Sequence, residues 1–390
     1  MNKYRYVTRV ALTVAMGGFL MGFDASVISG VVKFIETQFE LSKIELGWAV
    51  SSLTLTATLA MMVSGPLSDR IGRRKVLFLA AILYAVSAIA SAFSPTFTIL
   101  VIARMIGGLG VGASLIIAPM YIAEIAPPSV RGRMVSFNQL NIVIGISAAF
   151  FTNYLILQLG QSDATWAQSL GFDAHNWRWM LGLETLPAVL YFCGLFFVPE
   201  SPRWLLLQGR EEEAHRILSR AVGEAEARQE LDEIHASLAK DAGRERVSVM
   251  ELFAPAMRLV LTIGIVVAVI QQITGINAVF FYAPMIFEQS GIGTDASFAQ
   301  AVLVGLINLV FTIVAMLAID RIGRKPLLVF GLTGIALSMS VLAYGFSSAT
   351  YTITTEDLSN LPAEVNIPTL AELQDQTFES DVEFKQALRG

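Results

Sequence analysis

The sequence has few of the residues that redox and metal chemistry require. Its single cysteine, Cys193, excludes an internal disulfide, a thiolate metal site and a CxxC redox pair. The three histidines, His175, His215 and His235, lie in polar connections and lack the spacing of metal ligands. We therefore expect neither a cofactor nor a bound metal.

Charged residues are also scarce for a chain of this length. Only 15% of the 390 residues are charged, 54% are hydrophobic, and the mean hydropathy is +0.61. A soluble domain is far less apolar, so water is not the main solvent of this chain. The net charge of −5 averages over segments on opposite sides of a bilayer, and it indicates no nucleic-acid partner.

The chain is rich in apolar stretches long enough to cross a membrane, which takes about 20 residues. Nine of them predict an all-α transmembrane fold, at 7–32, 46–67, 75–93, 97–122, 134–158, 179–198, 257–287, 298–319 and 325–348. With the N-terminus in the cytoplasm, 21 of the 27 basic residues fall on the inner side, which is the usual bias. We expect a multi-pass protein of the cell inner membrane, surrounded by lipid and monomeric.

An internal repeat indicates two related halves. The motif DRIGRR at 69–74, after the second span, recurs as DRIGRK at 320–325 after the eighth, 251 residues later. Such repeats are typical of transporters built from two six-helix halves. Because the second copy follows only the second span of its half, three further spans are expected after the ninth. We expect a C-terminally truncated fragment rather than an incomplete paralogue, with about nine of twelve spans present.

This repeat predicts four segments. They are an N-terminal six-helix half at 1–200, a cytoplasmic helical linker at 201–250, the first three helices of the C-terminal half at 251–348, and a polar extracytoplasmic segment at 349–390. The linker has two interpretations. Its charged helices are either a solvated connection or a latch that holds the two halves together from the inside.

The repeated motif itself also has two interpretations. Arginines and lysines alone would only mark the inner side of the membrane. An acid, a tight glycine turn and several arginines at fixed spacing suit a charge-assisted latch instead. With this motif, the sequence resembles the major facilitator superfamily and, within it, the sugar porter family.

Further stretches carry the same resemblance. The glycine-rich run at 104–112 lies inside an apolar span without a preceding strand, so its glycines predict close helix packing rather than a nucleotide loop. The segments 119–127 and 199–204 resemble helix junctions of sugar porters, where acids and arginines pair at cytoplasmic helix ends. The resemblance assigns these residues to a cytoplasmic gate: Asp69, Arg70, Arg74, Glu124, Arg131, Glu200, Arg203, Asp320 and Arg321.

The seventh span contains adjacent amides, Gln271 and Gln272, followed by Thr274-Gly275 and Asn277. Amides are costly to bury in an apolar helix unless something hydrogen-bonds them, and another helix could do so. Alternatively, Thr274-Gly275 weakens the helix and the amides recognise sugar hydroxyls. The match to the sugar porter substrate motif favours the second interpretation. The resemblance implies a substrate site of Gln139, Gln271, Gln272, Asn277 and Asn308.

Three ionisable residues, Asp24, Arg104 and Glu184, lie within apolar spans. Such residues are rare and are usually paired or functional. Asp24 and Arg104 are either a purely structural pair or a proton switch in which Asp24 takes a proton from outside and releases Arg104. Glu184 would then tune or relay that proton. Proton-coupled sugar porters resemble this sequence at Asp24, whereas facilitators tend to carry a neutral residue there.

These observations predict a transporter of a monosaccharide (a pentose, a hexose or inositol) that works by alternating access as a proton symporter. An energy-independent facilitator and a transporter-like sugar sensor are the alternatives, and a drug exporter fits the amide-rich span less well. No nucleophile, base and orienting acid occur together, so an enzyme is not expected.

Overall fold

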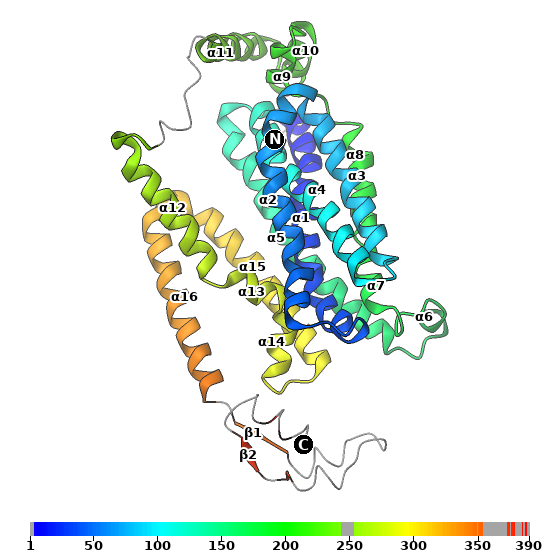
Figure 1. Cartoon of the computed structure of the whole chain (residues 1–390). Coiled ribbons are helices and arrows are strands. Elements are labelled where there is room, and N and C mark those ends of the chain that lie inside the picture. The colour runs from blue at the N-terminus through cyan, green and yellow to red at the C-terminus, as the bar shows by residue number, and fades with distance from the viewer. Residues whose placement is uncertain are drawn as a thin grey trace. The chain divides into compact units, whose positions relative to one another are not determined.

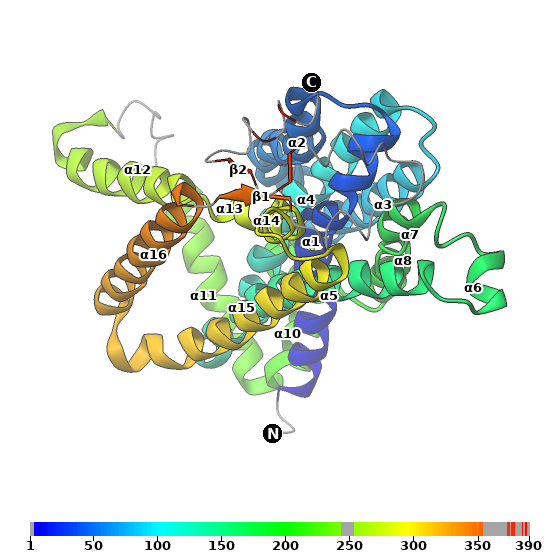
Figure 2. The same cartoon turned by 90° about the horizontal axis from the view of Figure 1, so that it is seen from below.

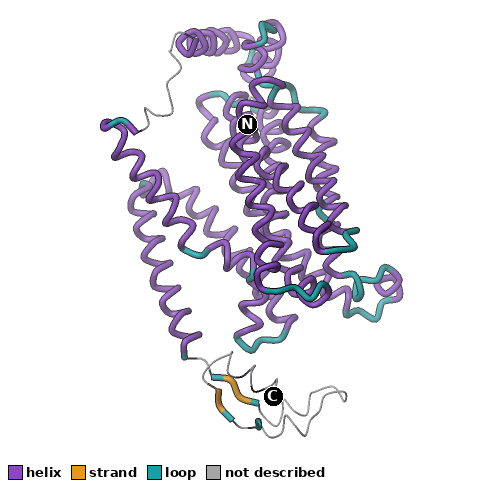
Figure 3. The backbone as a smooth tube through the Cα atoms, in the orientation of Figure 1, coloured by secondary structure: helices purple, strands orange, loops and turns teal. Residues whose placement is uncertain are grey.

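The computed structural model describes residues 4–242, 253–348 and 350–353, together with 373, 374, 376–378, 384 and 387. Nearly all of these residues are helical, and each of the two strands has only two residues (Figure 3). The chain divides into two compact units, 1–316 and 317–390. The architecture is therefore all-α, as the sequence predicts.

Eight helical segments of the described chain are long and apolar enough to cross a membrane. The first five are α1 (Arg5–Gln38), α2 (Lys43–Ile71), α3 (Arg73–Ala92), α4 (Phe97–Ile125) and α5 (Pro128–Gly160) (Figure 1). The others are Pro255–Phe281, Thr294–Ile319 and Arg324–Ser347. They match eight of the nine predicted spans.

The predicted span 179–198 is not one continuous helix, which corrects the sequence analysis. It is divided between α7 (Asn176–Gly182) and α8 (Thr185–Leu195). Pro187, in the first turn of α8, has no N–H to donate to the carbonyl of Leu183. Bonds of the i→i+3 type therefore replace the α-helical pattern at the junction, including that from Glu184 N–H to the Leu181 carbonyl at 3.3 Å.

Helix α1 lies at the centre of the first bundle. It packs against α5 and α4 and also contacts α7 and α8, while α2 and α3 pack against α4 (Figure 2). The α2–α4 contact is close because of glycine. A Cβ on Gly108 would meet the carbonyl oxygen of Leu53, and one on Gly112 would meet that of Ala57. The glycine-rich run thus serves helix packing, as predicted.

Both copies of the repeated motif form the same local structure. Helix α2 ends at Ile71, Gly72 has a φ of +104°, and α3 begins at Arg73. In the second copy, α15 (Thr294–Ile322) ends before Gly323, whose φ is +89°, and α16 (Arg324–Ser347) follows. Only glycine adopts such torsions without strain, so each copy is a sharp connection between two apolar helices.

Short helices follow the first bundle: α6 (Thr165–Ser169) before α7, and then α9 (Pro202–Leu207), α10 (Glu211–Val222) and α11 (Glu224–Ala242). The last three lie at the end of the bundle that carries the N-terminus (Figure 1). The charged segment from residue 201 is helical, as predicted. It is more than a solvated connection, because Leu205, Ala214 and Leu218 are fully buried in the same core cluster as α1 and α4.

The seventh span is interrupted where the sequence predicts it. A 3₁₀ turn at Pro255–Met257 leads into α12 (Arg258–Ile273), and α13 (Ile276–Phe281) and α14 (Ala283–Gln289) follow. Gly275 separates α12 from α13 with a left-handed φ of +77°. In the second unit, β1 (Tyr351–Thr352) pairs antiparallel with β2 (Thr377–Phe378).

Candidate functional site

Asp24 and Arg104 form a buried ion pair between α1 and α4. Nη1 of Arg104 donates to Oδ1 of Asp24, and Nη2 donates to the Asp24 backbone carbonyl at 3.0 Å. The side chains are 0% and 2% exposed. Removing two charges from water is costly, so such a pair needs close geometry and further hydrogen bonds to be stable.

Glu184 is the third charged residue at this place. It is 1% exposed at the junction of α7 and α8, and it interacts electrostatically with Asp24 and Arg104. We call Asp24, Arg104 and Glu184 the buried triad. The carboxyls of Asp24 and Glu184 share a hydrogen bond, and the described residues give Arg104 Nε no partner. The triad therefore holds two acids, one base and spare bonding capacity.

Glycine makes room for the triad. A Cβ on Gly107 of α4 would lie 2.9 Å from Asp24 Oδ2 and closer still to the hydroxyl of Ser87. Any larger residue would push the carboxylate away from Arg104. The local sequence Arg104-Met105-Ile106-Gly107 thus supplies both the cation and the space for its partner.

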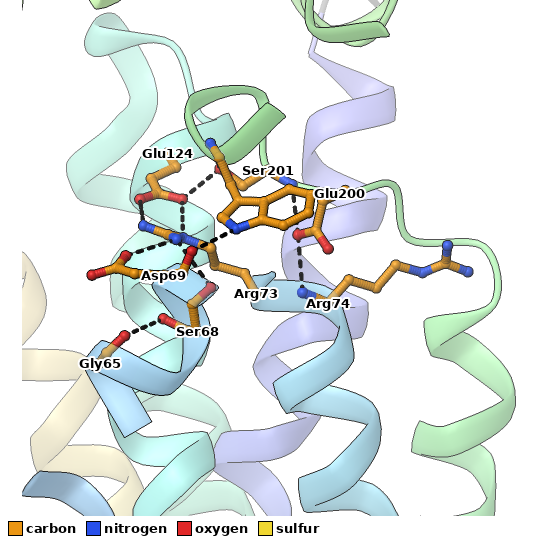
Figure 4. Close-up of polar contacts among 9 residues, drawn as sticks. Gly65, Ser68, Asp69, Arg73, Arg74, Glu124, Glu200 and Ser201 are labelled. Atoms are coloured by element: carbon orange, nitrogen blue, oxygen red, sulfur yellow. Dashed lines mark hydrogen bonds and ion pairs between the residues drawn. The ribbon is translucent and has the colours of Figure 1, made fainter. Parts of the chain in front are cut away.

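A second charged site lies where α2, α3, α4 and the α8–α9 connection meet (Figure 4). Arg73 is its centre. Its Nε and Nη2 donate to the two carboxylate oxygens of Glu124, each at 3.0 Å, and its Nη1 lies 2.9 Å from Asp69. Ser201 donates to Glu124 from the start of α9. This bidentate geometry is the strong form of an arginine–carboxylate interaction.

Glu200 completes the site from the other side. Its Oε1 accepts hydrogen bonds from the backbone N–H of Arg74 at 3.0 Å and of Ser201 at 2.9 Å (Figure 4). A Cβ on Gly72 would lie 2.5 Å from its other oxygen, so glycine is needed here for space as well as for its torsion. We call Asp69, Arg73, Arg74, Glu124, Glu200 and Ser201 the loop network.

A cavity of about 860 Å³ lies between the loop network and α11. Its charged lining residues are Asp69, Arg73, Glu124, Arg131, Arg203, Glu230 and Glu233. Burial raises the pKa of the Glu230 carboxyl; the Arg131 guanidinium opposes this shift, and Glu233 and Glu226 reinforce it. Charged residues of both signs, from the bundle and from α11, therefore line this cavity.

The predicted amide site lies on α12 and α13. Gln271, Gln272 and Asn277 are exposed, and Asn277 Nδ2 donates to Gln272 Oε1 at 2.8 Å across the Gly275 turn. Gln139 is exposed on α5, and Asn308 is half-buried on α15. An aromatic contact connects α13 with α5, because the ring centroids of Phe280 and Phe150 lie 6.1 Å apart.

The family model described as "Sugar (and other) transporter" matches residues 10–360. The chain belongs to this family. Among its relatives, the arabinose-proton symporter of Bacillus subtilis (strain 168) is 40% identical over 341 residues, which cover 87% of this chain and 71% of that protein. The D-xylose-proton symporter of Escherichia coli (strain K12) is 38% identical over 367 residues, covering 87% and 72%.

Solved structures of sugar transporters agree with this placement. The proton:xylose symporter XylE bound to 6-bromo-6-deoxy-D-glucose is 36% identical and superposes with a TM-score of 0.75, covering 88% of this chain and 76% of that one. A partially occluded, inward-open XylE from E. coli gives 0.71 at the same identity, covering 83% and 75%. The chain is therefore a multi-pass membrane transporter with the major facilitator fold, and not an enzyme, as the sequence predicts.

Within this sugar transporter, the structure brings together only part of the predicted gate. Asp69, Glu124 and Glu200 lie in the loop network, and Arg74 contributes its backbone N–H. The guanidinium of Arg74 donates instead to the backbone carbonyls of Leu195 and Phe196. Arg131 donates to the Ala126 carbonyl, and Arg203 lines the cavity.

The remaining predicted gate residues lie elsewhere. Arg70 is exposed, Arg321 is exposed in the second unit, and the side chain of Asp320 lies outside the described residues. Arg73 was not among the predicted gate residues, although it is 3% exposed and lies at the centre of the loop network. The motif alone did not distinguish it from the neighbouring arginines, because the torsion of Gly72 decides which of them turns inward. Ser201 was also missed, and its position at the start of α9 gave no separate signal.

Proposed function

We propose that this sugar transporter is a proton symporter for a monosaccharide and works by alternating access. The observation that carries the proposal is the buried Asp24–Arg104 pair with Glu184 beside it. A charged pair in an apolar bundle is expensive to maintain. The free-energy cost of burying this pair is explained if Asp24 gains and loses a proton during the transport cycle. Two relatives, an arabinose-proton symporter and a D-xylose-proton symporter, support the same proposal.

The proton step follows from electrostatics. A proton that reaches Asp24 from outside neutralises the carboxylate. This removes the electrostatic attraction between Asp24 of α1 and Arg104 of α4. Arg104 then turns to Glu184, the other acid of the buried triad. This change alters how α1 and α4 pack, and it favours the inward-facing state. Return of the proton to the cytoplasm restores the Asp24–Arg104 pair.

The sugar step uses amides. Gln271, Gln272 and Asn277, with Gln139 and Asn308, present both donors and acceptors, which hydroxyl groups of a sugar require. The Gly275 turn separates the two amide-bearing helices, so α13 can move relative to α12 when sugar binds. Binding on one side of the membrane is thereby coupled to closure of the other.

The loop network is proposed to hold the inner end of the first half rigid. It joins α2, α3, α4 and α9 through Arg73, Glu124 and Glu200, at the end of the bundle that carries the N-terminus. Arg321 and Asp320 belong to the second copy of the motif and are proposed to serve the other half in the same way. We place the N-terminus in the cytoplasm, the protein in the cell inner membrane, and the functional unit as a monomer.

The Asp24→Asn variant tests this function in sealed proteoliposomes. Labelled D-xylose and L-arabinose serve as probes, since relatives are named for these sugars. The wild type is expected to concentrate sugar when a proton gradient is imposed, and the variant is expected to lose this accumulation while retaining sugar exchange without a gradient. Asp163→Asn, which changes an exposed loop carboxylate, is the matched control. Uphill accumulation by Asp24→Asn would rule out proton coupling through Asp24.

A further inference from the structure

A further cavity of the first unit has no role in the mechanism above. It has a volume of about 430 Å³ and is lined by α3, the α8–α9 connection, α9 and α10. We call it the side pocket. Its charged lining residues are three bases, Arg74, Lys75 and Arg210, and two acids, Glu200 and Glu213. This excess of one positive charge suits an anion that carries one negative charge.

Both acids of the side pocket are already bound to groups of the protein. Oε1 of Glu200 accepts hydrogen bonds from two backbone N–H groups, and Glu213 pairs with Arg210 at 2.7 Å. Lys75, by contrast, is exposed, and it has no ion pair with any of the described residues. Its ammonium group is therefore available to a ligand in the pocket.

The guanidinium of Arg74 is held in place at the wall of the side pocket. Its side chain extends away from Arg73 and the rest of the loop network (Figure 4). Nε and Nη2 donate to the carbonyls of Leu195 and Phe196 at 3.2 and 3.1 Å, and the guanidinium carbon lies 5.3 Å from the centroid of the Phe78 ring. These bonds leave further N–H donors of the guanidinium for a ligand.

An aromatic cluster continues the side pocket onto the apolar surface of the bundle. The ring centroids of Phe78, Phe192 and Phe196 lie 5.0 to 5.4 Å from one another. Phe196 is 60% exposed, and the neighbouring Phe197 is 85% exposed. Apolar surface of this kind is more stable against lipid chains than against water. Positive charge and lipid-facing surface therefore meet at one place.

We propose that the side pocket binds the headgroup of an anionic phospholipid. Lys75 and Arg74 donate to the phosphate oxygens, and the acyl chains lie along Phe196 and Phe197. Basic pockets beside membrane helices are typical sites for anionic lipids. A soluble phosphate compound would match the charge of the pocket but would leave the exposed rings uncovered. The proposal goes beyond sugar and proton transport and depends on neither, because the membrane fold alone brings lipid to this surface.

Binding of phosphatidylglycerol to the full chain in detergent tests the proposal. Native mass spectrometry measures the tightest site as this lipid is titrated, with zwitterionic phosphatidylcholine in a parallel series. The wild type is expected to bind phosphatidylglycerol more tightly than phosphatidylcholine. Lys75→Gln is expected to weaken phosphatidylglycerol binding about fivefold, the contribution of one basic residue near a membrane surface. Lys75→Arg keeps the charge and is expected to bind like the wild type.

Arg133→Gln is the matched control. Arg133 is an exposed base near the start of α5 and does not line the side pocket, so its loss should leave the tightest site unchanged. The proposal is overturned if the wild type binds both lipids equally, if Lys75→Gln binds phosphatidylglycerol like the wild type, or if Arg133→Gln weakens binding to the same extent. If Lys75→Gln does not fold, Lys75→Met decides by the same criterion.

A soluble anion is distinguished from a lipid by competition. Glycerol 1-phosphate carries the phosphate of the headgroup without acyl chains, and it is expected to displace phosphatidylglycerol only at far higher concentration. If it displaces the lipid at equal concentration, the side pocket is a site for soluble phosphate compounds, and the lipid is the wrong occupant.

Discussion

The buried triad and the loop network contain similar residues but differ in how completely their polar atoms are paired. All three nitrogens of Arg73 bind oxygen, from Glu124, Asp69 and the Ser68 carbonyl. In the triad, by contrast, the described residues give Arg104 Nε no partner, and the two acids, Asp24 and Glu184, are hydrogen-bonded to each other. Arg73 and the triad are buried and lie in the same unit, whereas Asp69 of the loop network is exposed.

The difference indicates two kinds of work. A fully paired network has one best arrangement and resists change, which suits a fixed joint between helices. A site with spare donors and acceptors can exchange partners when a proton arrives, at little cost in lost hydrogen bonds. The difference therefore supports the proposal that the loop network is rigid and that the triad switches.

The largest expected effect comes from removing one charge of the triad. Arg104→Ala leaves Asp24 buried beside Glu184 without a cation, and it is expected to lower the free energy of unfolding by about 3 to 5 kcal/mol at neutral pH. Unfolding by SDS titration in bicelles measures this loss. The neutral double variant Asp24→Asn with Arg104→Gln is expected to recover most of the stability without recovering accumulation of sugar.

The same two variants can also contradict the proposed difference between the triad and the loop network. If the double variant is as unstable as Arg104→Ala, the triad is a structural joint like the loop network. If the double variant still concentrates D-xylose on a proton gradient, switching belongs to other residues.

The next largest effect concerns the loop network and tests whether Arg73 is its central residue. Arg73→Ala removes a bidentate bond and leaves Glu124 largely buried without its cation, so a loss of about 2 to 3 kcal/mol is expected. Arg73→Lys should restore little of it, because an ammonium cannot match both oxygens. Arg70→Ala, three residues earlier and exposed, is expected to stay within about 0.5 kcal/mol of the wild type. Equal losses at the two positions would contradict the central place of Arg73.

Much of this arrangement could be predicted from the sequence. Apolar length located eight of the nine spans, and Thr274-Gly275 predicted the break between α12 and α13. The rarity of charges in apolar helices singled out Asp24, Arg104 and Glu184, which the structure places together. These signals are strong because membrane burial penalises each exception heavily.

Other features depend on details that local patterns do not carry. The motif contains three arginines after Asp69, and only the torsion of Gly72 decides that Arg73 turns inward while Arg70 stays exposed. Because the stretch 179–198 is largely apolar, its composition does not indicate the break between α7 and α8 that Pro187 causes. Tyr84 and Tyr191 are ordinary residues for an apolar span, and only helix packing makes both of them fully buried.

The smallest expected effect concerns α11, where charges are neither fully paired nor buried. Burial raises the pKa of Glu230 above its ordinary value of 4.5, so its neutral form favours the docked helix. That contribution is complete below 4.5 and is lost as the pH rises through the raised pKa. Because Glu230 is half-exposed, solvent screening keeps the effect below about 1 kcal/mol. Hydrogen exchange of α11, corrected for intrinsic rates, should therefore quicken over this range in the wild type.

The Glu230→Gln variant isolates this contribution, because glutamine stays neutral throughout and should flatten the pH dependence of exchange in α11. Glu212→Gln, which changes an exposed acid of α10, should leave the wild-type slope in place. An unchanged slope in Glu230→Gln would mean that other carboxylates set the docking of α11. A flattened slope would instead show that ionisation of Glu230 weakens the docking of α11, so that the strength of this contact varies with pH.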